Sequence, residues 1–343
     1  MKAAIFREHG GIDNLEIAEM PEPSAQAGEV LLRVRAAAMN HLDLWARRGL
    51  PGIEIPLPHI GGSDIAGEVV SSGAGVEAIA EGARVVVNPG LWDGTCEWCL
   101  KGQHSLCVNY RIIGEHTNGG FAEFVAVPAA NLVRIPDHFS FEQAAAVPLV
   151  FLTAWRALIT QARLRAGETV LILGASGGAA SAGIQIAKLA GAYVYAVTSS
   201  EEKAAQARAL GADQTIDRTK EDFSKQVFKL TNRRGVDVVL ENTGEKTWEG
   251  SLRALARGGR LVTYGGTTGP DGQTNIRLLF WKQVQIIGST MGTADEFATV
   301  MRLVWEGKLR AVVDRVLPLE QIKEAHEILE AGEQFGKIVL KID

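Results

Sequence analysis

Cysteine is scarce in this chain, whose 343 residues include only three cysteines, all between positions 96 and 107. An odd, clustered set argues against a disulfide framework, and the first residues, MKAAIFREHGG, lack the apolar segment and cleavage site of an export signal. No apolar run reaches the ~20 residues of a membrane-spanning helix. The formal net charge of -5 argues against binding to nucleic acid or to anionic membranes. These absences predict a soluble, cytoplasmic protein.

The residues that are present suffice for a packed core, because 46% are hydrophobic and 22% charged, and the length allows two domains. Short apolar segments separated by Gly and Pro turns occupy the first ~150 residues. Their β-branched residues predict an irregular β domain. The expected strands lie within 28–39, 64–73, 82–90 and 121–135.

Farther along the chain, apolar strands alternate with helical segments. We expect strands within 168–174, 192–200, 236–244 and 260–266, and helices within 177–191, 201–211 and 248–259. Strands that alternate with helices in this way predict an α/β fold, a parallel sheet with crossover helices. Two more helices are expected within 297–309 and 322–332, and a last strand within 336–342.

A glycine-rich turn in this second region indicates a nucleotide site. Gly174, Gly177 and Ala180 have G-x-x-G-x-x-A spacing between an apolar strand and a helix. Small residues let backbone N–H groups and the helix N-terminus approach a pyrophosphate. The expected contacts come from this whole turn, which also includes Ser176, Gly178 and Ala179.

The end of the next strand bears on the choice of nucleotide. An acidic residue there is typical of NAD sites, but this chain has Thr198, Ser199 and Ser200, followed by Lys203. Hydroxyl groups and a cation suit a 2′-phosphate, and Arg218 is placed to reach it. These residues favour NADP(H) over NAD(H). The alternative is that Lys203 is only a charged residue on an exposed helix face.

Several motifs, in order, resemble the medium-chain dehydrogenase/reductase superfamily of zinc alcohol dehydrogenases and NADPH:quinone reductases. They include NHLDLWARRG, PHIGGSDIAGEVVSSG, NGGFAEFV, GASGGAASAGIQIAKLAGA, VDVVLENTG and FGKIVLKI. The resemblance implies a GroES-like catalytic domain (1–150 and 288–343, with a zinc lobe at about 88–112). It implies a Rossmann cofactor domain over 151–287, an active site between the two domains, and a homodimer or homotetramer acting on a small molecule.

Zinc-containing members carry four cysteines in one loop, spaced Cys-x2-Cys-x2-Cys-x7-Cys. This chain matches the last three with Cys96, Cys99 and Cys107, and has Asp93 at the first position. A carboxylate is an acceptable zinc ligand, so these four residues are expected to bind one structural zinc. Such a closed site has no position for water and would hold the loop together without taking part in catalysis.

The ligands of the family's catalytic zinc are not matched. The corresponding positions hold Asn40, Ser63 with Asp64, and Leu149. Asn40 and Ser63 are weak neutral ligands, and Leu149 cannot bind a metal. Activation of an alkoxide on zinc is therefore expected to be lost. An improvised site remains an alternative, drawing on His41, His59, His116, Asp43 and Asp64.

Asn40 followed by Asp43 is similar to the metal-free quinone and enoyl reductase branch, which transfers hydride from NADPH. Asn40 is expected to donate a hydrogen bond either to the carbonyl of the acceptor or to the backbone of its loop, with equal weight. The proton is expected to come from His41, His59, His116 or water. The substrate-pocket candidates are Trp45, His59, Trp92 and His116. Tyrosines typical of that branch are replaced by Trp45 and Pro51.

The resemblance also implies further cofactor contacts, at Asn242, Gly244, Gly265, Gly266, Ser289, Thr290 and Lys337, the lysine near the phosphates. The favoured function is NADPH-dependent reduction of an enone, quinone or enoyl thioester. The alternatives are a zinc-type alcohol dehydrogenase with unusual ligands, and an NADPH-binding protein with little turnover.

Overall fold

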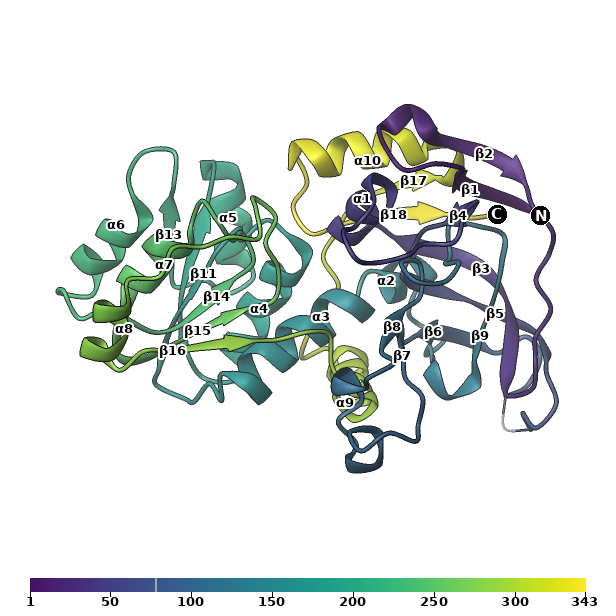
Figure 1. The fold of residues 1–343 in the computed structure, drawn as a ribbon, viewed down its shortest axis with the longest axis horizontal. Helices are drawn as coiled ribbons and strands as arrows, with labels where there is room; N and C mark the ends of the chain where they lie inside the picture. Colours follow the sequence, from purple (N-terminus) through teal and green to yellow (C-terminus); the bar gives the residue numbers. More distant parts are fainter. Residues whose placement is uncertain (78) are drawn as a thin grey trace. The chain divides into compact units, whose positions relative to one another are not determined.

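The computed structural model describes residues 1–77 and 79–343, which form two compact units (Figure 1). Unit 1 comprises Met1–Leu149 and Gly292–Asp343, and unit 2 comprises Val150–Met291. The expected boundaries were after residues 150 and 287. The second boundary lies four residues later than expected, because the segment that follows the last strand of unit 2 stays with that unit.

Unit 1 is built mainly on β-strands, as expected from its apolar segments and turns. It contains β1 (Lys2–Phe6), β2 (Leu15–Glu19), β3 (Glu29–Ala38), β4 (His59–Ile60), β5 (Asp64–Ser72), β6 (Arg84–Val87), β7 (Gly90–Leu91), β8 (Arg111–Ile112), β9 (Phe124–Pro128), β10 (Leu132–Arg134), β17 (Val313–Pro318) and β18 (Lys337–Lys341). The largest sheet has the order β10-β6-β5-β3-β18-β17, with β9 also paired to β3. Smaller sheets have the orders β2-β1-β4 and β7-β8.

The centre of the large sheet brings three distant segments together. β3 pairs antiparallel with β5 on one side and with β18 on the other, so that Ala38, at its end, faces both Asp64 and Val339. The last residue of β3 thus lies beside the first residue of β5 and the middle residue of β18. Alternating apolar side chains from these strands, among them Leu32, Ile65 and Leu340, form the core of unit 1.

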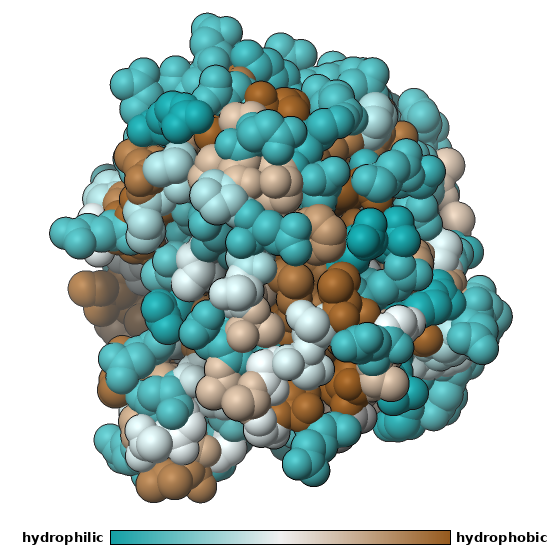
Figure 2. Space-filling view, turned by 90° about the vertical axis from the view of Figure 1, so that its right-hand side faces the viewer, coloured by the Kyte–Doolittle hydropathy of each residue, from teal (hydrophilic) through white to brown (hydrophobic). Residues whose placement is uncertain are grey.

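Among the described residues, four α-helices lie wholly in unit 1: α1 (His41–Arg48), α2 (Phe141–Ala145), α9 (Ala294–Trp305) and α10 (Ile322–Ala331). α3 (Pro148–Trp155) crosses the boundary between the units and continues as a π-helix over Arg156–Gln161. The helical stretch Phe141–Gln161 is long and apolar enough to cross a membrane, but it is 72% buried, as the core helix of a globular protein would be. The face of unit 1 in Figure 2 is mostly hydrophilic, with apolar side chains in small groups.

Unit 2 is an α/β unit with one parallel sheet, as expected. Its elements are β11 (Thr169–Ile172), α4 (Gly178–Leu189), β12 (Tyr193–Thr198), α5 (Glu201–Ala209), β13 (Gln214–Asp217), α6 (Phe223–Leu230), β14 (Val236–Glu241), α7 (Trp248–Ala254), β15 (Leu255–Thr263), α8 (Ile276–Lys282) and β16 (Gln285–Gly288). The strand order β13-β12-β11-β14-β15-β16 is that of doubly wound dinucleotide-binding sheets. Its strands read as apolar runs because helices cover both faces.

Candidate active site

A buried ion pair lies where three strands of unit 1 meet. Lys337 Nζ is 2.8 Å from Asp64 Oδ2 and 2.5 Å from Asn40 Oδ1. The exposed fractions of the three side chains are 3%, 0% and 5% for Lys337, Asp64 and Asn40. Asp64 begins β5, Lys337 begins β18, and Asn40 follows the end of β3, so the strand register described above assembles this cluster.

Every oxygen of the cluster accepts a hydrogen bond. Asn40 Nδ2 donates to Asp64 Oδ2 at 3.0 Å, and the backbone N–H of Leu149 donates to Asp64 Oδ1 at 2.7 Å. The ammonium of Lys337 has only donors, so the amide oxygen of Asn40 must face it and the amide nitrogen must face the carboxylate. Buried charges persist when paired and hydrogen-bonded in this way. The amide of Asn40 is therefore committed to its neighbours.

Asp43 holds the loops that carry this cluster. Its Oδ2 accepts the backbone N–H of Asn40 at 2.7 Å, which caps α1, and its Oδ1 accepts the N–H of Gly62 at 3.1 Å. Burial raises the pKa of Asp43 to about 7, although both N–H donors and the Lys337 ammonium favour the ionised form. Because both oxygens bond loop backbone, Asp43 orients the site.

The aromatic and histidine residues expected to line the substrate pocket do not lie together on one surface. His41 and Trp45 lie one turn apart on α1 with their rings in edge contact at 5.1 Å, and burial lowers the pKa of His41. His59, expected in the substrate pocket, is fully buried instead. Its Nε2 lies 3.1 Å from the carbonyl oxygen of Gly114, and its ring packs against Phe6 at 5.2 Å. The structure gives His59 a place in the core.

The other two pocket candidates lie near the metal lobe. Trp92 stacks on His104 with ring centroids 4.5 Å apart and lines a cavity of about 550 Å³ whose lining includes neither Asn40 nor Lys337. His116 Nδ1 accepts the backbone N–H of Ile112 at 3.2 Å. Trp92 and the Asn40 cluster are therefore not brought into one described cavity.

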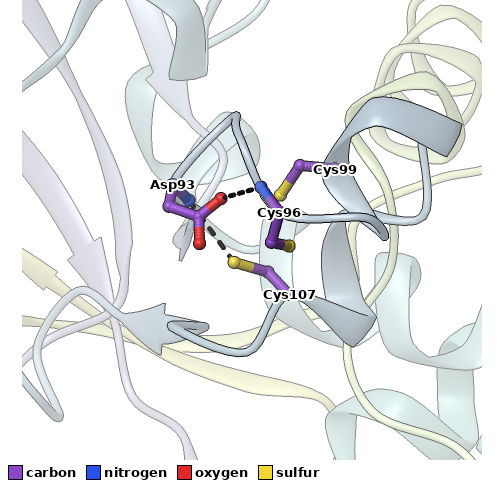
Figure 3. A group of neighbouring side chains, drawn as sticks. All are labelled: Asp93, Cys96, Cys99 and Cys107. Carbon is purple, nitrogen blue, oxygen red and sulfur yellow. Dashed lines mark hydrogen bonds between the residues drawn. The ribbon is translucent and has the colours of Figure 1, made fainter.

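The four expected zinc ligands do come together (Figure 3). One ligand atom from each of Asp93, Cys96, Cys99 and Cys107 lies within 4.8 Å of the others. Asp93 Oδ1 accepts the backbone N–H of Cys96 at 2.9 Å, and Oδ2 accepts from Asn109 Nδ2 at 2.9 Å, which orients the carboxylate. Among residues 1–77 and 79–343, this is the one cluster of three or more His, Cys, Asp or Glu side chains placed to bind a metal.

Three thiols and a carboxylate at this separation fit tetrahedral zinc. Burial and the neighbouring thiols raise the pKa of Cys99 to about 12, so thiolates would not persist together here without a cation. Zinc would supply the positive charge that keeps them ionised. β7 and β8 pair at the base of the lobe, with Gly90 opposite Ile112, and close the loop that contains all four residues.

In unit 2, the glycine turn forms the start of α4. Gly174 has φ +57°, in the left-handed region that glycine adopts without strain, and Gly177 is the N-cap of α4 with no side chain to bond the first helical amides. Those amides are free to bind an anion at the helix N-terminus. The remaining predicted cofactor residues all follow the carboxyl ends of strands in this unit: Ser176, Gly178, Ala179, Ala180, Ser199, Ser200, Lys203, Asn242, Gly244, Gly265, Gly266 and Thr290.

Two buried hydroxyl groups in unit 2 add to the fit with a dinucleotide. Thr198 Oγ1 and Ser289 Oγ have no hydrogen-bond partner within the described chain, and the residues are 3% and 8% exposed. Buried hydroxyl groups are normally bonded, so a bound ligand is a natural partner. The backbone N–H of Arg218 donates to the carbonyl of Thr198 at 3.0 Å, which brings Arg218 to the end of β12.

Sequence reasoning missed a second organiser in unit 2. Glu241 is fully buried, and its Oε1 accepts from the backbone N–H of Thr243 at 2.8 Å, the N–H of Gly244 at 3.1 Å and the hydroxyl of Thr247 at 2.9 Å. The carboxylate fixes the turn that contains Asn242. The sequence did contain a signal for this role, because Glu241 is an acidic residue at the end of the mostly apolar strand β14.

Comparisons with known proteins agree with these two units. Residues 26–137 match the family model described as the alcohol dehydrogenase GroES-like domain, and residues 178–306 match that of zinc-binding dehydrogenases. The chain is 35% identical to an acryloyl-coenzyme A reductase from Metallosphaera sedula, over 99% of both chains. It is 34% identical to an NAD-dependent alcohol dehydrogenase from Sulfolobus acidocaldarius, over 100% of both. The crystal structure of an NAD-dependent alcohol dehydrogenase has a TM-score of 0.96 and 45% identity, with 100% of both chains covered.

The chain belongs to the medium-chain dehydrogenase/reductase superfamily.

Unit 1 is accordingly its GroES-like unit and unit 2 its Rossmann unit. Membership implies an oxidoreductase that uses a nicotinamide cofactor, and also zinc, for which the Asp93 and cysteine cluster is a fitting site. The relatives include both a reductase and dehydrogenases, so membership does not choose between these reactions.

The Lys337 cluster includes Asn40 and Asp64, two of the residues that the resemblance matches to the ligands of the superfamily's catalytic zinc. Lys337 was expected near the cofactor phosphates, but its ammonium is bonded to Asn40 and Asp64 inside unit 1. No local pattern could have indicated this, because Lys337 is 273 residues from Asp64 and meets it only through the register of β18 against β3. The donor set here does not fit zinc, since an ammonium already bonds the one carboxylate.

Proposed function

We propose that this protein is an NADPH-dependent reductase of a C=C bond conjugated to a carbonyl, as in enones, quinones and enoyl thioesters, without catalytic zinc. The observation that carries the proposal is the Lys337 ammonium bonded to Asn40 and Asp64. The ammonium bonds Asn40 and Asp64, two of the residues that the resemblance matches to the superfamily's catalytic metal ligands. The Metallosphaera sedula relative, an acryloyl-coenzyme A reductase by name, supports this reaction class.

The donor chemistry argues against an alcohol dehydrogenase mechanism. Activation of an alcohol by the zinc mechanism needs a metal ion with an open coordination position, held by thiolates or imidazoles. Asn40 and Ser63 offer neutral oxygens, and Leu149 contributes a backbone N–H that is already bonded to Asp64. Reduction of a conjugated C=C does not require an alkoxide, and hydrogen-bond donors can stabilise the developing enolate.

Residues of unit 1 and unit 2 would have different roles in this reaction. NADPH, when bound, supplies the hydride. In unit 2, the start of α4 would bind the pyrophosphate, and Thr198 and Ser289 would meet the cofactor with their unbonded hydroxyl groups. In unit 1, Asp43 and Asp64 hold the loops of the site. His41, which follows Asn40 on α1, or water would provide the proton.

NADP(H) is favoured over NAD(H) as the cofactor. β12 ends in Thr198 without the acidic residue that binds the ribose hydroxyls in NAD sites, and Arg218 is exposed beside it. The Ser200 hydroxyl accepts the backbone N–H of Lys203 at 3.2 Å and caps α5, so Ser199 and the side chains of Lys203 and Arg218 are the groups proposed to meet a 2′-phosphate. NAD-dependent relatives make this a point for direct measurement.

Zinc content and a substrate panel test the proposal together. Protein purified without added metal or chelator should contain one zinc per chain, and NADPH should be oxidised with an enone, a quinone or a short enoyl thioester. Primary alcohols with NAD or NADP should give no turnover. Two zinc ions per chain with alcohol oxidation would support the alcohol dehydrogenase alternative, for which the 45% identical structure is the argument. Tight NADPH binding without turnover would support a non-enzymatic role.

A homodimer is the favoured assembly, in the cytoplasm. β16 is an edge strand of the parallel sheet, so one row of its backbone groups has no partner strand within the described chain. Close to it in sequence, Ile276, Phe280 and Trp281 of α8 are 72%, 64% and 66% exposed. Such an edge and apolar surface suit a second copy of this chain. Light scattering should give a dimer mass that Trp281→Lys converts to a monomer.

A further inference from the structure

Two hydrogen-bond donors at the Lys337 cluster lack acceptors. Ser63 is 0% exposed, and its Oγ has no hydrogen-bond partner among residues 1–77 and 79–343. Lys337 has three N–H groups, of which the described chain accepts two, through Asn40 and Asp64. Ser63 directly precedes Asp64, the residue whose carboxylate bonds the ammonium.

An unbonded hydroxyl in this position is costly for the fold. A buried polar group without a partner destabilises a protein by about 1–3 kcal/mol, and alanine would remove that cost. Such groups are rare in native proteins, and they are found where a ligand or water completes the bonding. The Lys337 ammonium indicates which kind of ligand atom would fit. Two donors, the Ser63 hydroxyl and the charged ammonium, suit an oxygen that carries negative charge.

We propose that Ser63 is a catalytic residue, whose hydroxyl donates together with the third N–H of Lys337 to the carbonyl oxygen of the unsaturated acceptor. This proposal rests on the proposed function. As the hydride and its electron pair form the new C–H bond at the β-carbon, the C=C electrons shift toward the carbonyl and the oxygen becomes an enolate. A proton then adds to the α-carbon, the C=O bond re-forms, and the cofactor leaves as NADP⁺.

The surrounding groups make these donors suitable for a developing enolate. Asp64 holds the ammonium from one side and Asn40 from another, so its free N–H has a fixed direction. Donors that are already oriented do not reorganise as the charge develops, which is the main advantage of such sites over water. Asn40 and Asp64 are positioning residues, because their own polar atoms are occupied within the cluster.

Ser63→Ala is the decisive variant, with Ser105→Ala as its matched control. Ser105 is also a buried serine of unit 1 whose hydroxyl has no partner in the described chain. For Ser63→Ala, we expect kcat with a short enoyl thioester to fall by about 10²-fold, the loss typical of one donor to an oxyanion. The Kd for NADPH should not change, and the melting temperature should stay the same or rise. Ser105→Ala should keep the wild-type kcat.

A structural role for Ser63 gives the opposite pattern. A lower melting temperature and weaker NADPH binding alongside the lower kcat, or an unchanged kcat in Ser63→Ala, would overturn the proposal. The carbonyl infrared band of a bound, ¹³C-labelled saturated thioester adds a readout without turnover. It should lie at lower frequency in the wild type than in Ser63→Ala, and equal frequencies in the two would also overturn it.

The wild type separates this inference from the function on which it rests. If the wild type reduces no conjugated C=C acceptor, the proposed function fails and the role of Ser63 fails with it. If the wild type reduces the thioester and Ser63→Ala does so equally well, the proposed function stands and only the role of Ser63 is lost.

Discussion

Lys337 Nζ and Asp64 Oδ2 lie 2.8 Å apart, and neither side chain is more than 3% exposed. The two residues begin strands on opposite sides of β3. A charge pair at such depth is held in place by the hydrogen bonds around it, and it is costly to disrupt from one side. The site of unit 1 therefore depends on a contact between residues that are 273 positions apart in the sequence.

Removal of the lysine charge alone should destabilise unit 1. Lys337→Met leaves the Asp64 carboxylate buried with only neutral donors, and we expect the free energy of unfolding to fall by about 3–5 kcal/mol. The double variant Lys337→Met/Asp64→Asn should lose less than the sum of the single variants, because no charge remains. Urea denaturation at pH 7 measures both. Lys341→Met, at an exposed lysine on the same strand, is the control. A Lys337→Met protein as stable as this control would contradict the assignment.

The proposal that Asp93 is the fourth zinc ligand can be tested by exchange of its side chain. Asp93→Cys restores a four-cysteine site, so it should retain one zinc and release it more slowly to a chromophoric chelator than the wild type. Asp93→Asn should release it faster, and Cys96→Ser should lose it during purification. Glu97→Gln alters an acidic residue of the same loop that is not in the cluster, and should leave zinc release unchanged. Full zinc content in Cys96→Ser would show that the metal is bound elsewhere.

The choice of cofactor should depend on Arg218. Arg218→Ala is expected to raise the Kd for NADPH about tenfold, equivalent to ~1.4 kcal/mol, by loss of one charge-assisted contact to the 2′-phosphate. The Kd for NADH should not change, since NADH lacks that phosphate. Fluorescence titration gives both constants, with Arg233→Ala, at another exposed arginine of unit 2, for comparison. Equal loss of affinity for both cofactors would indicate a general effect on the fold.

The stability of the protein should decline in mild acid through His326. This residue is 2% exposed, its Nδ1 lies 3.2 Å from Arg47 Nη1, and burial together with the nearby arginines lowers its pKa to about 3. Between the unfolded pKa of about 6.5 and this value, the unfolded chain binds the proton and the folded protein does not. Stability is therefore complete above pH 6.5 and falls by up to ~1.4 kcal/mol per pH unit as the pH drops.

His326→Gln removes this titration. Urea denaturation between pH 7 and pH 5 should give a shallower dependence of unfolding free energy on pH for the variant than for the wild type. Parallel dependences in the two proteins would mean that His326 is protonated equally readily in both states.

Local patterns were enough for much of this protein. Alternating apolar segments predicted most strands, and the order of strand and helix predicted the parallel sheet of unit 2, because hydrophobic periodicity and glycine turns act over a few residues. The grouping of the four candidate metal ligands was also predictable, since Asp93, Cys96, Cys99 and Cys107 lie within one short loop and chain connectivity alone keeps them near one another.

The tertiary structure decided what occupies the site of unit 1. Lys337 is 297 residues from Asn40, and only the antiparallel register of β18 on β3 brings its ammonium to that amide. The same holds for Asp43, whose second carboxylate oxygen reaches Gly62 on another loop, and for His59, which the fold encloses beside Phe6. The chemical type of each side chain follows from the sequence. Its hydrogen-bond and packing partners depend on strand pairing between segments far apart in the chain, and no local pattern encodes that pairing.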